Sequence, residues 1–585
     1  MCGIIGQINN EIPINKHLFE QMRDTLTHRG PDGYGTYISD NGKNALGHRR
    51  LSLIDLSATG TQPICNENKT IWITVNGEIY NYKKLKEQLI SLGHSFYTNT
   101  DSETIVHAYE QWGTEVFQRL KGMYAIGIWD DNKKELIIAR DRFGIKPIYY
   151  YKDDSSFIFA SEIKAIIKNP DIPRNINFES FSNYFIYRYI PCPNTIWKNI
   201  YKLPPAHYLI LKNNQIDIKK YWSLNASSNE IDTYAAINKV NDLISTSVKE
   251  HLQADIPVGT FLSGGYDSSA LVYYQNLINY LPKTFSIGFK NWNKSEHKFA
   301  EIVANKFDTE HYSEIISKDD YDTIDHLMYY YDEPIADISI LPTFFVSKLA
   351  SKKVKAVISG EGADEIFAGY TWHRASKSSL SNKEKAYYFL KNKYAVNDYA
   401  SAMSMGMFDS TNIHKLINTD LVDNIPKDTF WFYRKHYLSD VSNIKRFQFL
   451  DINTFMSELV LTKIDRASMA NSLEVRVPFL DHELVEYMFS LNENSYIDKK
   501  KKKMLLYENI KDHLPKEILS RKKQGFVGPD KFYMNYNWYK DVIFSGKLIS
   551  DKIINRNYIK KLINNKDQWR LWKIAVMEIW YSKWV

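Results

Sequence analysis

Cysteine is scarce in this chain of 585 residues, which contains only Cys2, Cys65 and Cys192. Three cysteines cannot form a disulfide framework, and no CxxC pair indicates a zinc site. No uninterrupted apolar run reaches the ~18 residues that a transmembrane helix requires. The first twenty residues include Glu11 and Lys16 and lack the apolar segment of a signal peptide. We therefore expect a cytoplasmic protein with no membrane partner.

An excess of charge of one sign is also missing. The 75 basic and 68 acidic residues leave a net charge of +7, which over this length does not indicate a nucleic-acid partner. The one dense basic cluster, Lys499–Lys503, is typical of a solvated loop. The length exceeds what a single hydrophobic core supports, so we expect two or more domains.

Residues 1–211 are predicted to form a first domain of short strands and turns with intervening helices. Strand signals occur at Ile71–Val75, Leu136–Ala139 and Pro147–Tyr151, and helical patterns at Lys83–Leu92 and Thr104–Trp112. Strands with helices on both faces indicate a layered α+β domain.

A polar, turn-rich segment at residues 212–235 is predicted to be a linker, because exposed connectors have this composition. Beyond it, residues 236–585 are predicted to form the second domain. Its strands are expected at Val258–Leu262, Thr284–Phe289 and Val354–Ile358, with helices between them. Alternating strands and helices indicate a parallel α/β sheet with ligands at the carboxyl ends of its strands.

The remainder of the second domain, residues 375–585, is expected to be mostly helical. Four tryptophans near its end argue against a disordered tail.

The segment Ser263–Ser269, Ser-Gly-Gly-Tyr-Asp-Ser-Ser, is the strongest local motif. It is predicted to be a glycine loop that follows a strand and leads into a helix over Ala270–Leu281. Glycine N–H groups, serine hydroxyls and a helix N-terminus suit phosphate binding. No Gly-Lys-Ser/Thr follows, so the motif is not a Walker loop but matches the PP-loop of enzymes that transfer AMP. A structural turn with a helix cap is the alternative.

Carboxylates gather at a second strand end, in Ser359–Glu365. Paired carboxylates there can hold Mg²⁺ and provide a general base, although an acidic helix N-terminus explains them equally well. Arg521-Lys522-Lys523-Gln524 is basic, and a lysine in it can neutralise a leaving pyrophosphate, but a surface loop has the same composition.

Cys2 would acquire a free α-amino group beside its thiol if Met1 were removed. That amine, with a reference pKa of roughly 8, can act as the base that activates the thiol. Asn76 and the N–H of Gly77 offer the two donors of an oxyanion hole. Taken alone, each of these features is also compatible with a structural role, and His28 and His48 need no catalytic role.

Taken together, the motifs resemble a known family. Cys2-Gly3-Ile4, His28–Gly33, His48–Ser52 and Asn76–Asn81 look like a class II glutamine amidotransferase domain. The later motifs Ser263–Ser269, Ser359–Glu365 and Glu474–Asp481 extend the resemblance to glutamine-hydrolysing asparagine synthetase over about residues 1–530. The resemblance implies an N-terminal Ntn-hydrolase αββα sandwich and a C-terminal PP-loop sheet with a helical C-terminal part.

By resemblance, the first domain would hydrolyse glutamine. Cys2 would be the nucleophile, and Asn76 and Gly77 would stabilise the oxyanion. Arg50 would bind the glutamine carboxylate, while Glu78 and Asp101 would hold its amino group.

By the same resemblance, the second domain would use ATP and Mg²⁺. Glu361 would position and deprotonate ammonia, Lys523 would offset charge on pyrophosphate, and Asp267 and Asp364 would hold Mg²⁺. The residues expected to contact ATP are Leu262, Ser263, Gly264, Gly265, Asp267, Ser268, Ser269, Ile287, Ser359 and Gly360. Tyr266 stands where the family has a small aliphatic residue, and we expect it to pack behind the loop.

The resemblance implies that aspartate is amidated through a β-aspartyl-AMP intermediate, with ammonia passed internally between the two sites. Two alternatives remain open: another acceptor carboxylate, such as that of a uronic-acid sugar, and a non-catalytic relic. The intact Cys2, Asp267 and Asp364 weigh against the relic. The partners implied are small-molecule substrates and a second copy of the chain in a homodimer.

Overall fold

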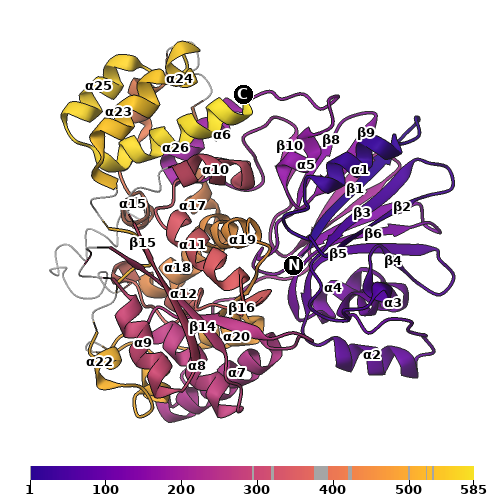
Figure 1. Cartoon of the computed structure of the whole chain (residues 1–585), viewed down its shortest axis with the longest axis horizontal. Coiled ribbons are helices and arrows are strands. Elements are labelled where there is room, and N and C mark those ends of the chain that lie inside the picture. The colour runs from indigo at the N-terminus through magenta and orange to yellow at the C-terminus, as the bar shows by residue number, and fades with distance from the viewer. Residues whose placement is uncertain are drawn as a thin grey trace.

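The computed structural model consists of two lobes that correspond to the two halves of the chain (Figure 1). Among the described residues, no helix combines the length and apolar character needed to cross a membrane. The structure describes residues 2–290, 292, 295–317, 322–373, 393–418, 425–498, 501–521, 524–529 and 533–585.

The first lobe contains two six-stranded antiparallel sheets, ordered β10-β8-β9-β1-β3-β2 and β12-β11-β7-β6-β5-β4. The strands of the first sheet are β1 (Gly3–Asn9), β2 (Gly33–Ile38), β3 (Asn44–Arg50), β8 (Tyr149–Lys152), β9 (Ser156–Ala160) and β10 (Ile200–Lys202). Those of the second are β4 (Ile64–Cys65), β5 (Ile71–Ile79), β6 (Gly122–Asp130), β7 (Glu135–Arg140), β11 (His207–Lys212) and β12 (Gln215–Lys220).

The two sheets pack face to face, and helices cover both outer faces. Successive side chains of a strand point to opposite sides, so Ile4 of β1 lies in the core between the sheets and Ile5 packs in the outer helical layer. The helices on the first sheet include α1 (Lys16–Asp24), α5 (Ile163–Ile167) and α6 (Phe178–Tyr187), and those on the second are α2 (Tyr82–Ser91), α3 (Asp101–Trp112) and α4 (Val116–Arg119). This is the αββα sandwich of the Ntn-hydrolase fold.

The predicted linker at residues 212–235 contains a strand that the sequence did not indicate. β12 pairs with β11 from His207↔Lys220 to Lys212↔Gln215 and forms the edge of the second sheet. Its side chains are mostly exposed. An edge strand that buries so little surface has the polar composition of a connector, which explains the difference.

The second lobe is built around a five-stranded parallel sheet ordered β15-β14-β13-β16-β17. Its strands are β13 (Val258–Phe261), β14 (Lys283–Phe289), β15 (Glu310–Ile316), β16 (Ala356–Ile358) and β17 (Glu474–Arg476). β17 lies in the region expected to be mostly helical. It has only three residues, and two of them, Glu474 and Arg476, are charged and form an ion pair at 2.6 Å between Oε1 and Nε. It therefore lacks the apolar pattern by which a strand is recognised.

Helices make up most of the rest of this lobe and pack on the sheet and beyond it. Those between the strands are α7 (Thr233–His251), α8 (Tyr266–Leu277), α9 (His297–Lys306), α10 (Asp322–Tyr331), α11 (Ile340–Ser351), α12 (Ala363–Ile366), α15 (Lys393–Met403), α16 (Ser410–Leu416), α17 (Trp431–Lys435), α18 (Asn443–Leu450) and α19 (Leu461–Met469), with a π-helical stretch at Asp451–Val460. After β17 come α20 (His482–Ser490), α21 (Met504–Ile510), α22 (Lys516–Leu519), α23 (Tyr536–Ser545), α24 (Lys547–Ser550), α25 (Arg556–Asn564) and α26 (Gln568–Trp584).

Helix α8 begins earlier than the sequence predicts. It starts at Tyr266 with Gly265 as its N-cap and ends at Leu277, whereas Ala270–Leu281 was expected. The residues Asp267, Ser268 and Ser269 therefore lie in the first helical turn rather than in the loop. Serine and aspartate favour helix N-termini, so the polar half of the motif suits a first turn as well as a loop.

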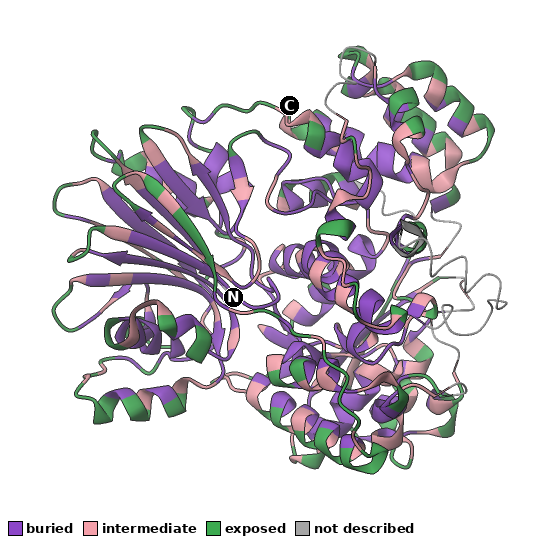
Figure 2. Cartoon of the chain, turned by 180° about the vertical axis from the view of Figure 1, so that it is seen from behind, coloured by how far each residue is buried: buried purple, intermediate pink, exposed green. Residues whose placement is uncertain are grey.

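The two lobes share one hydrophobic core, in which α6 packs with helices from the end of the chain, including α26. Tyr184 donates a hydrogen bond to the carbonyl of Lys573 at 2.8 Å, and the rings of Trp197 and Trp580 lie 5.5 Å apart. Buried residues (purple in Figure 2) follow the strands of both lobes and the helices between them. The two lobes are thus joined by packing and not only by the connector.

Candidate active site

Cys2 lies just before β1 and is almost completely buried. Its backbone N–H donates to Asn76 Oδ1 at 3.0 Å, and its carbonyl accepts from Arg29 Nε at 3.0 Å. Burial raises the pKa of the Cys2 thiol above its usual value. A buried thiol is mostly protonated at neutral pH, so it needs a neighbouring base to become a nucleophile. Met1 lies outside the described residues.

Asn76 and Gly77 lie on β5 beside Cys2. With Oδ1 bound to Cys2, the Nδ2 amide of Asn76 is buried and has no hydrogen-bond partner among the residues that the structure describes. Buried polar groups are nearly always paired, so an unpaired donor here marks a place where an acceptor can bind. Gly77 is required for packing, because an added Cβ would lie 2.1 Å from the carbonyl oxygen of Met123.

Arg50 is the last residue of β3. The residue before it, Arg49, pairs with Gly3 of β1. Two donors of Arg50 bind carbonyl groups of the following loop, that of Ser57 at 2.6 Å and that of Asp55. The guanidinium is therefore held in place from one side.

The Arg50 guanidinium packs directly against Gly60, which has no side chain. An added Cβ at Gly60 would lie 2.3 Å from Arg50 Nη2 and 2.7 Å from the methyl group of Thr100. Arg50 thus lies next to the residue that precedes Asp101. The loop carrying Gly60 has no room for a side chain there.

Glu78 and Asp101 complete the group predicted to bind glutamine. Asp101 is the first residue of α3, and its Oδ2 accepts from the N–H of Ile79 at 2.8 Å. Burial raises the pKa of Asp101 to about 6. Glu78 Oε1 lies 3.3 Å from Nη2 of Arg476, a buried residue of the second lobe. The tertiary structure therefore brings together the residues predicted for glutamine hydrolysis, and Arg476 on β17 of the second lobe contacts one of them, Glu78.

The two histidines of the first motifs are structural. His48 is fully buried and its Nε2 lies 3.2 Å from the carbonyl of Val75. Burial lowers its pKa to about 3, so it stays neutral. His28 Nε2 lies 3.1 Å from Glu162. Among the described residues, neither histidine forms a hydrogen bond with Cys2.

A cavity of about 420 Å³ lies at the carboxyl ends of the parallel strands in the second lobe. This is the position in which open α/β sheets bind ligands. Most of the residues predicted to act there line it: Leu262, Ser263, Asp267, Ser268, Ile287, Ser359, Gly360, Glu361 and Asp364.

Three of the predicted ATP contacts lie elsewhere. Gly265 lines an adjoining cavity of about 110 Å³, and Ser269 is buried in α8. Gly264 has φ +69°, and an added Cβ would lie 2.5 Å from the backbone of Phe299. Glycine at this position is required by the conformation and packing of the loop.

Tyr266 lines the adjoining cavity and contacts residues of α21 and α22. Its hydroxyl donates to the carbonyl of Leu519 at 2.5 Å, and its ring lies 6.1 Å from that of Tyr507. The bulky residue is thus accommodated against the segment after α21.

Asp267 and Asp364 face each other across Lys503, whose Nζ lies 2.5 Å from one carboxylate and 2.7 Å from the other. The prediction that Lys499–Lys503 is a solvated loop is therefore wrong for Lys503, which is buried. Burial disfavours the charged form of Lys503, but the two carboxylates outweigh it and raise its pKa. Two carboxylates directed at one cation also suit the oxygen-ligand preference of Mg²⁺.

Glu361 lines the large cavity, and its Oε2 has no hydrogen-bond partner in the described part of the chain. Glu365, four residues later, accepts from the hydroxyl of Tyr370 at 2.8 Å. Burial and the neighbouring Asp364 raise the pKa of Glu365 to about 8, so it is mostly protonated at neutral pH. Glu365 also lines this cavity, as a carboxyl group with a raised pKa.

Lys523 lies outside the described residues. Its neighbours on both sides reach the site: Arg521 donates to the carbonyl of Ser263 at 3.1 Å and to Glu296 at 2.6 Å, and Gln524 lines the cavity. Burial raises the pKa of Glu296 to about 7 despite this pairing. Arg521 therefore contacts the phosphate loop, and Gln524 lies at the same cavity.

Comparison with protein families decides the identity of the chain. A family model described as glutamine amidotransferase domain matches residues 1–222, and one described as asparagine synthase matches residues 239–582. The chain belongs to the asparagine synthase family. It is an enzyme, a glutamine-dependent ligase.

Relatives of this family match the whole chain. Asparagine synthetase [glutamine-hydrolyzing] 1 of Bacillus subtilis (strain 168) is 32% identical, over 100% of this chain and 96% of the relative. Asparagine synthetase [glutamine-hydrolyzing] 3 of the same organism is 29% identical, over 97% and 94%. A solved structure of glutamine phosphoribosylpyrophosphate amidotransferase from B. subtilis covers 50% of this chain and 67% of its own, with 18% identity and a TM-score of 0.30, too low to support an argument.

For three basic residues of this asparagine synthase family member, the sequence did not predict a place at the sites. Lys503 was hidden in a lysine run. Arg29 belongs to the His28–Gly33 motif, and its Nε donates to the carbonyl of Cys2. Arg188 lines the large cavity from the first half of the chain. Its φ of +73° at the end of α6 is a tertiary feature with no sequence signal.

Proposed function

We propose that the protein makes asparagine from aspartate, with glutamine as the nitrogen donor and ATP as the activating substrate. ATP and aspartate would give β-aspartyl-AMP and pyrophosphate, and ammonia would displace AMP. Glutamine and water supply that ammonia and leave glutamate. The free Asn76 Nδ2 beside Cys2 is the observation that carries the first half of the proposal, because it is an unpaired donor next to the nucleophile.

In the first site, the Cys2 thiolate attacks the glutamine amide carbon and forms a tetrahedral oxyanion. Asn76 Nδ2 and the N–H of Gly77 are the proposed donors to that oxyanion. Ammonia then leaves, and water hydrolyses the thioester to glutamate. Arg50 would pair with the α-carboxylate, and Glu78 with Asp101 would hold the α-ammonium group. Removal of Met1 is required, since only then is the amine on the nucleophile itself.

In the second site, Leu262 and Ile287 offer an apolar surface for adenine, and Ser263 with the start of α8 suits the phosphates. Mg²⁺, bound by Asp267 and Asp364, would neutralise phosphate charge. Lys503, which contacts both carboxylates, would offset the negative charge that develops on the leaving pyrophosphate, alone or with Lys523. Glu361 would accept a proton from the attacking ammonia.

The acceptor end of the cavity carries charges of both signs. Arg188 and Lys463 line it together with Asp337, and Arg188 Nη1 lies 3.8 Å from Asp337 Oδ2. An amino acid presents a carboxylate and an ammonium group at once, so a mixed set of this kind supports aspartate as the acceptor. The proposed passage of ammonia between the sites and the homodimer both remain predictions.

An acceptor screen tests the proposal. The purified enzyme is given glutamine, ATP and Mg²⁺ with aspartate, glutamate or a uronic acid, and pyrophosphate release is followed. We expect release with aspartate, together with equal amounts of AMP and asparagine. Release with a uronic acid but not with aspartate would replace the proposed acceptor. The absence of ATP-dependent chemistry with every acceptor would support the relic hypothesis.

The raised pKa of Asp101 predicts how glutamine use depends on pH. Below its pKa of about 6, Asp101 is a neutral carboxyl that no longer attracts the α-ammonium group. We expect kcat/KM for glutamine to fall about tenfold per pH unit below that value, because this ratio reports the free enzyme. Asp101→Asn should have a low kcat/KM without this dependence. Glutamate release is measured, and an unchanged pH profile in Asp101→Asn would remove Asp101 from this role.

A further inference from the structure

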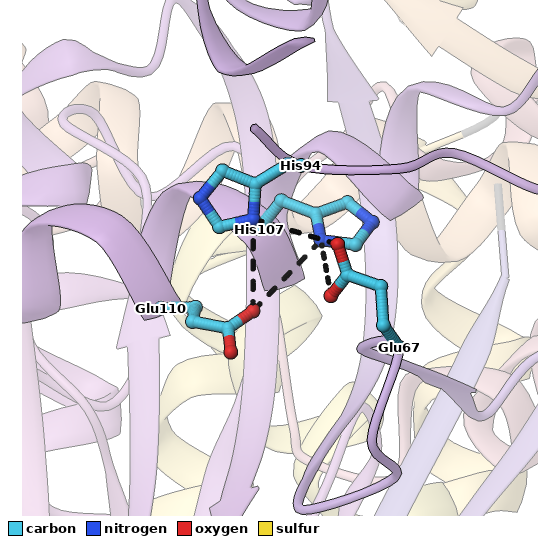
Figure 3. A group of neighbouring side chains, drawn as sticks. All are labelled: Glu67, His94, His107 and Glu110. Carbon is cyan, nitrogen blue, oxygen red and sulfur yellow. Dashed lines mark ion pairs between the residues drawn. The ribbon is translucent and has the colours of Figure 1, made fainter. Parts of the chain in front are cut away.

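Four side chains of the first lobe that the proposed reaction does not use converge on one point (Figure 3). They are Glu67 in the turn between β4 and β5, His94 in the loop after α2, and His107 and Glu110 on α3. One ligand atom from each lies within 4.8 Å of all the others. Three segments distant in sequence thus bring two imidazoles and two carboxylates together.

Both histidines are held from outside through Nε2. His94 Nε2 lies 3.2 Å from Gln111 Oε1, and His107 Nε2 lies 3.5 Å from Glu103 Oε1. Both partners are acceptors, so they favour the tautomer with the proton on Nε2. The Nδ1 lone pair of each ring is then directed at the carboxylates. Histidines that bind metals usually have this outer contact.

The carboxylates are oriented in the same way. Glu67 Oε1 accepts from the N–H of Ser95 at 2.9 Å, and Glu110 Oε1 accepts from Asn66 Nδ2 at 3.0 Å. Glu110 Oε2 faces both histidines, whereas Glu67 faces His107 with Oε2 and His94 with Oε1. With neutral histidines, the inward atoms are all acceptors, and such a set is stabilised by a cation.

The distances distinguish a metal site from simple ion pairs. The Nδ1 atoms lie 3.4 to 4.0 Å from the nearest oxygens of Glu67 and Glu110. Charge-assisted hydrogen bonds are shorter, about 2.7–2.9 Å. Two ligands of a tetrahedral zinc ion, each about 2.1 Å from it, lie about 3.4 Å apart. In addition, His107 is fully buried, and no described residue forms a hydrogen bond with its Nδ1.

We propose that Glu67, His94, His107 and Glu110 bind a divalent transition-metal ion of the zinc class. Two imidazoles with two carboxylates suit Zn²⁺ better than Mg²⁺ or Ca²⁺, which prefer oxygen ligands alone. The ion fixes the loop after α2 to α3, and that loop leads to Asp101. Since Glu67 and Glu110 are partly exposed, the ion enters from solvent. The role is structural and separate from both reaction sites.

Zinc binding to the full-length, metal-stripped protein tests the proposal. We expect one Zn²⁺ per chain by calorimetric titration and elemental analysis, and a higher unfolding midpoint in its presence. His94→Ala and Glu110→Gln should each weaken binding by at least about 100-fold, and Gln111→Ala by about tenfold. The matched controls His17→Ala and Glu87→Gln change exposed residues of the same types in the same lobe and should bind as the parent does.

Other outcomes overturn the proposal. It fails if the parent protein binds no Zn²⁺ beyond what a variant lacking both His94 and Glu110 binds, or if it prefers Ca²⁺ to Zn²⁺. It also fails if both ligand variants bind as tightly as the controls. Circular dichroism shows whether each variant is folded, and Glu110→Gln decides if His94→Ala does not fold, because the Glu110 side chain is partly exposed. No substrate is present, so the result is independent of the proposed reaction.

Discussion

Cys2→Ala should abolish glutamine-dependent synthesis, with a loss of at least about 10³-fold, while added ammonia still supports the reaction. The physical reason is that the thiol forms the covalent bond in the first site, and the second site has its own cavity in the other lobe. Glutamate, asparagine and pyrophosphate are measured separately with glutamine and with ammonium salts as nitrogen donor. Burial of Cys2 leaves little room for a substitute nucleophile.

Cys65→Ala is the matched control, since Cys65 lies on β4 and contacts the hydroxyl of Tyr97 rather than the site. Its glutamine-dependent activity should be unchanged. If ammonia-driven synthesis vanished together with glutamine use in Cys2→Ala, the two reactions would not be separable and the assignment of one to each lobe would be wrong.

Asp364→Asn should reduce pyrophosphate release by about 10²–10³-fold, with both glutamine and ammonia as donors. The substitution keeps the size of the side chain but removes one of the two carboxylates that face Lys503, and with it half of the proposed Mg²⁺ site. Hydrolysis of glutamine to glutamate should persist, because none of the residues around Cys2 changes. Aspartate-dependent pyrophosphate release and glutamate formation are followed in parallel.

Asp541→Asn, an exposed position on α23, serves as the control and should behave as the parent enzyme. Raising the concentration of Mg²⁺ should restore part of the activity of Asp364→Asn if the lost carboxylate is a ligand. Unchanged pyrophosphate release in this variant would remove Asp364 from the metal site.

The sequence predicted the core strands of both lobes more reliably than their edges. β5, β7, β13 and β14 are buried and carry continuous or alternating apolar residues, so their signals are local. β12 is exposed, and β17 is short and charged. Each is a strand because of the neighbour it pairs with: β12 pairs with the preceding strand β11 at the edge of a sheet, and β17 pairs with β16 across more than a hundred residues.

In the candidate sites, too, some residues have a local sequence signal and others do not. The glycine loop, Cys2 and the Asn76-Gly77 pair could be recognised because the chemistry they suggest depends on residues that are adjacent in sequence. Lys503 could not, because its burial between Asp267 and Asp364 depends on contacts over more than a hundred residues.

The sequence by itself determined the family resemblance, the two-domain α/β architecture and the types of side chain available for each reaction. Only the tertiary structure decided which of these side chains meet: that Arg476 of the second lobe covers Glu78, and that Lys503 is buried between two carboxylates. It also decided that four residues from three segments form the proposed zinc site. The reason is that local propensities depend on neighbouring residues, whereas burial and charge pairing depend on segments that meet only when the chain folds.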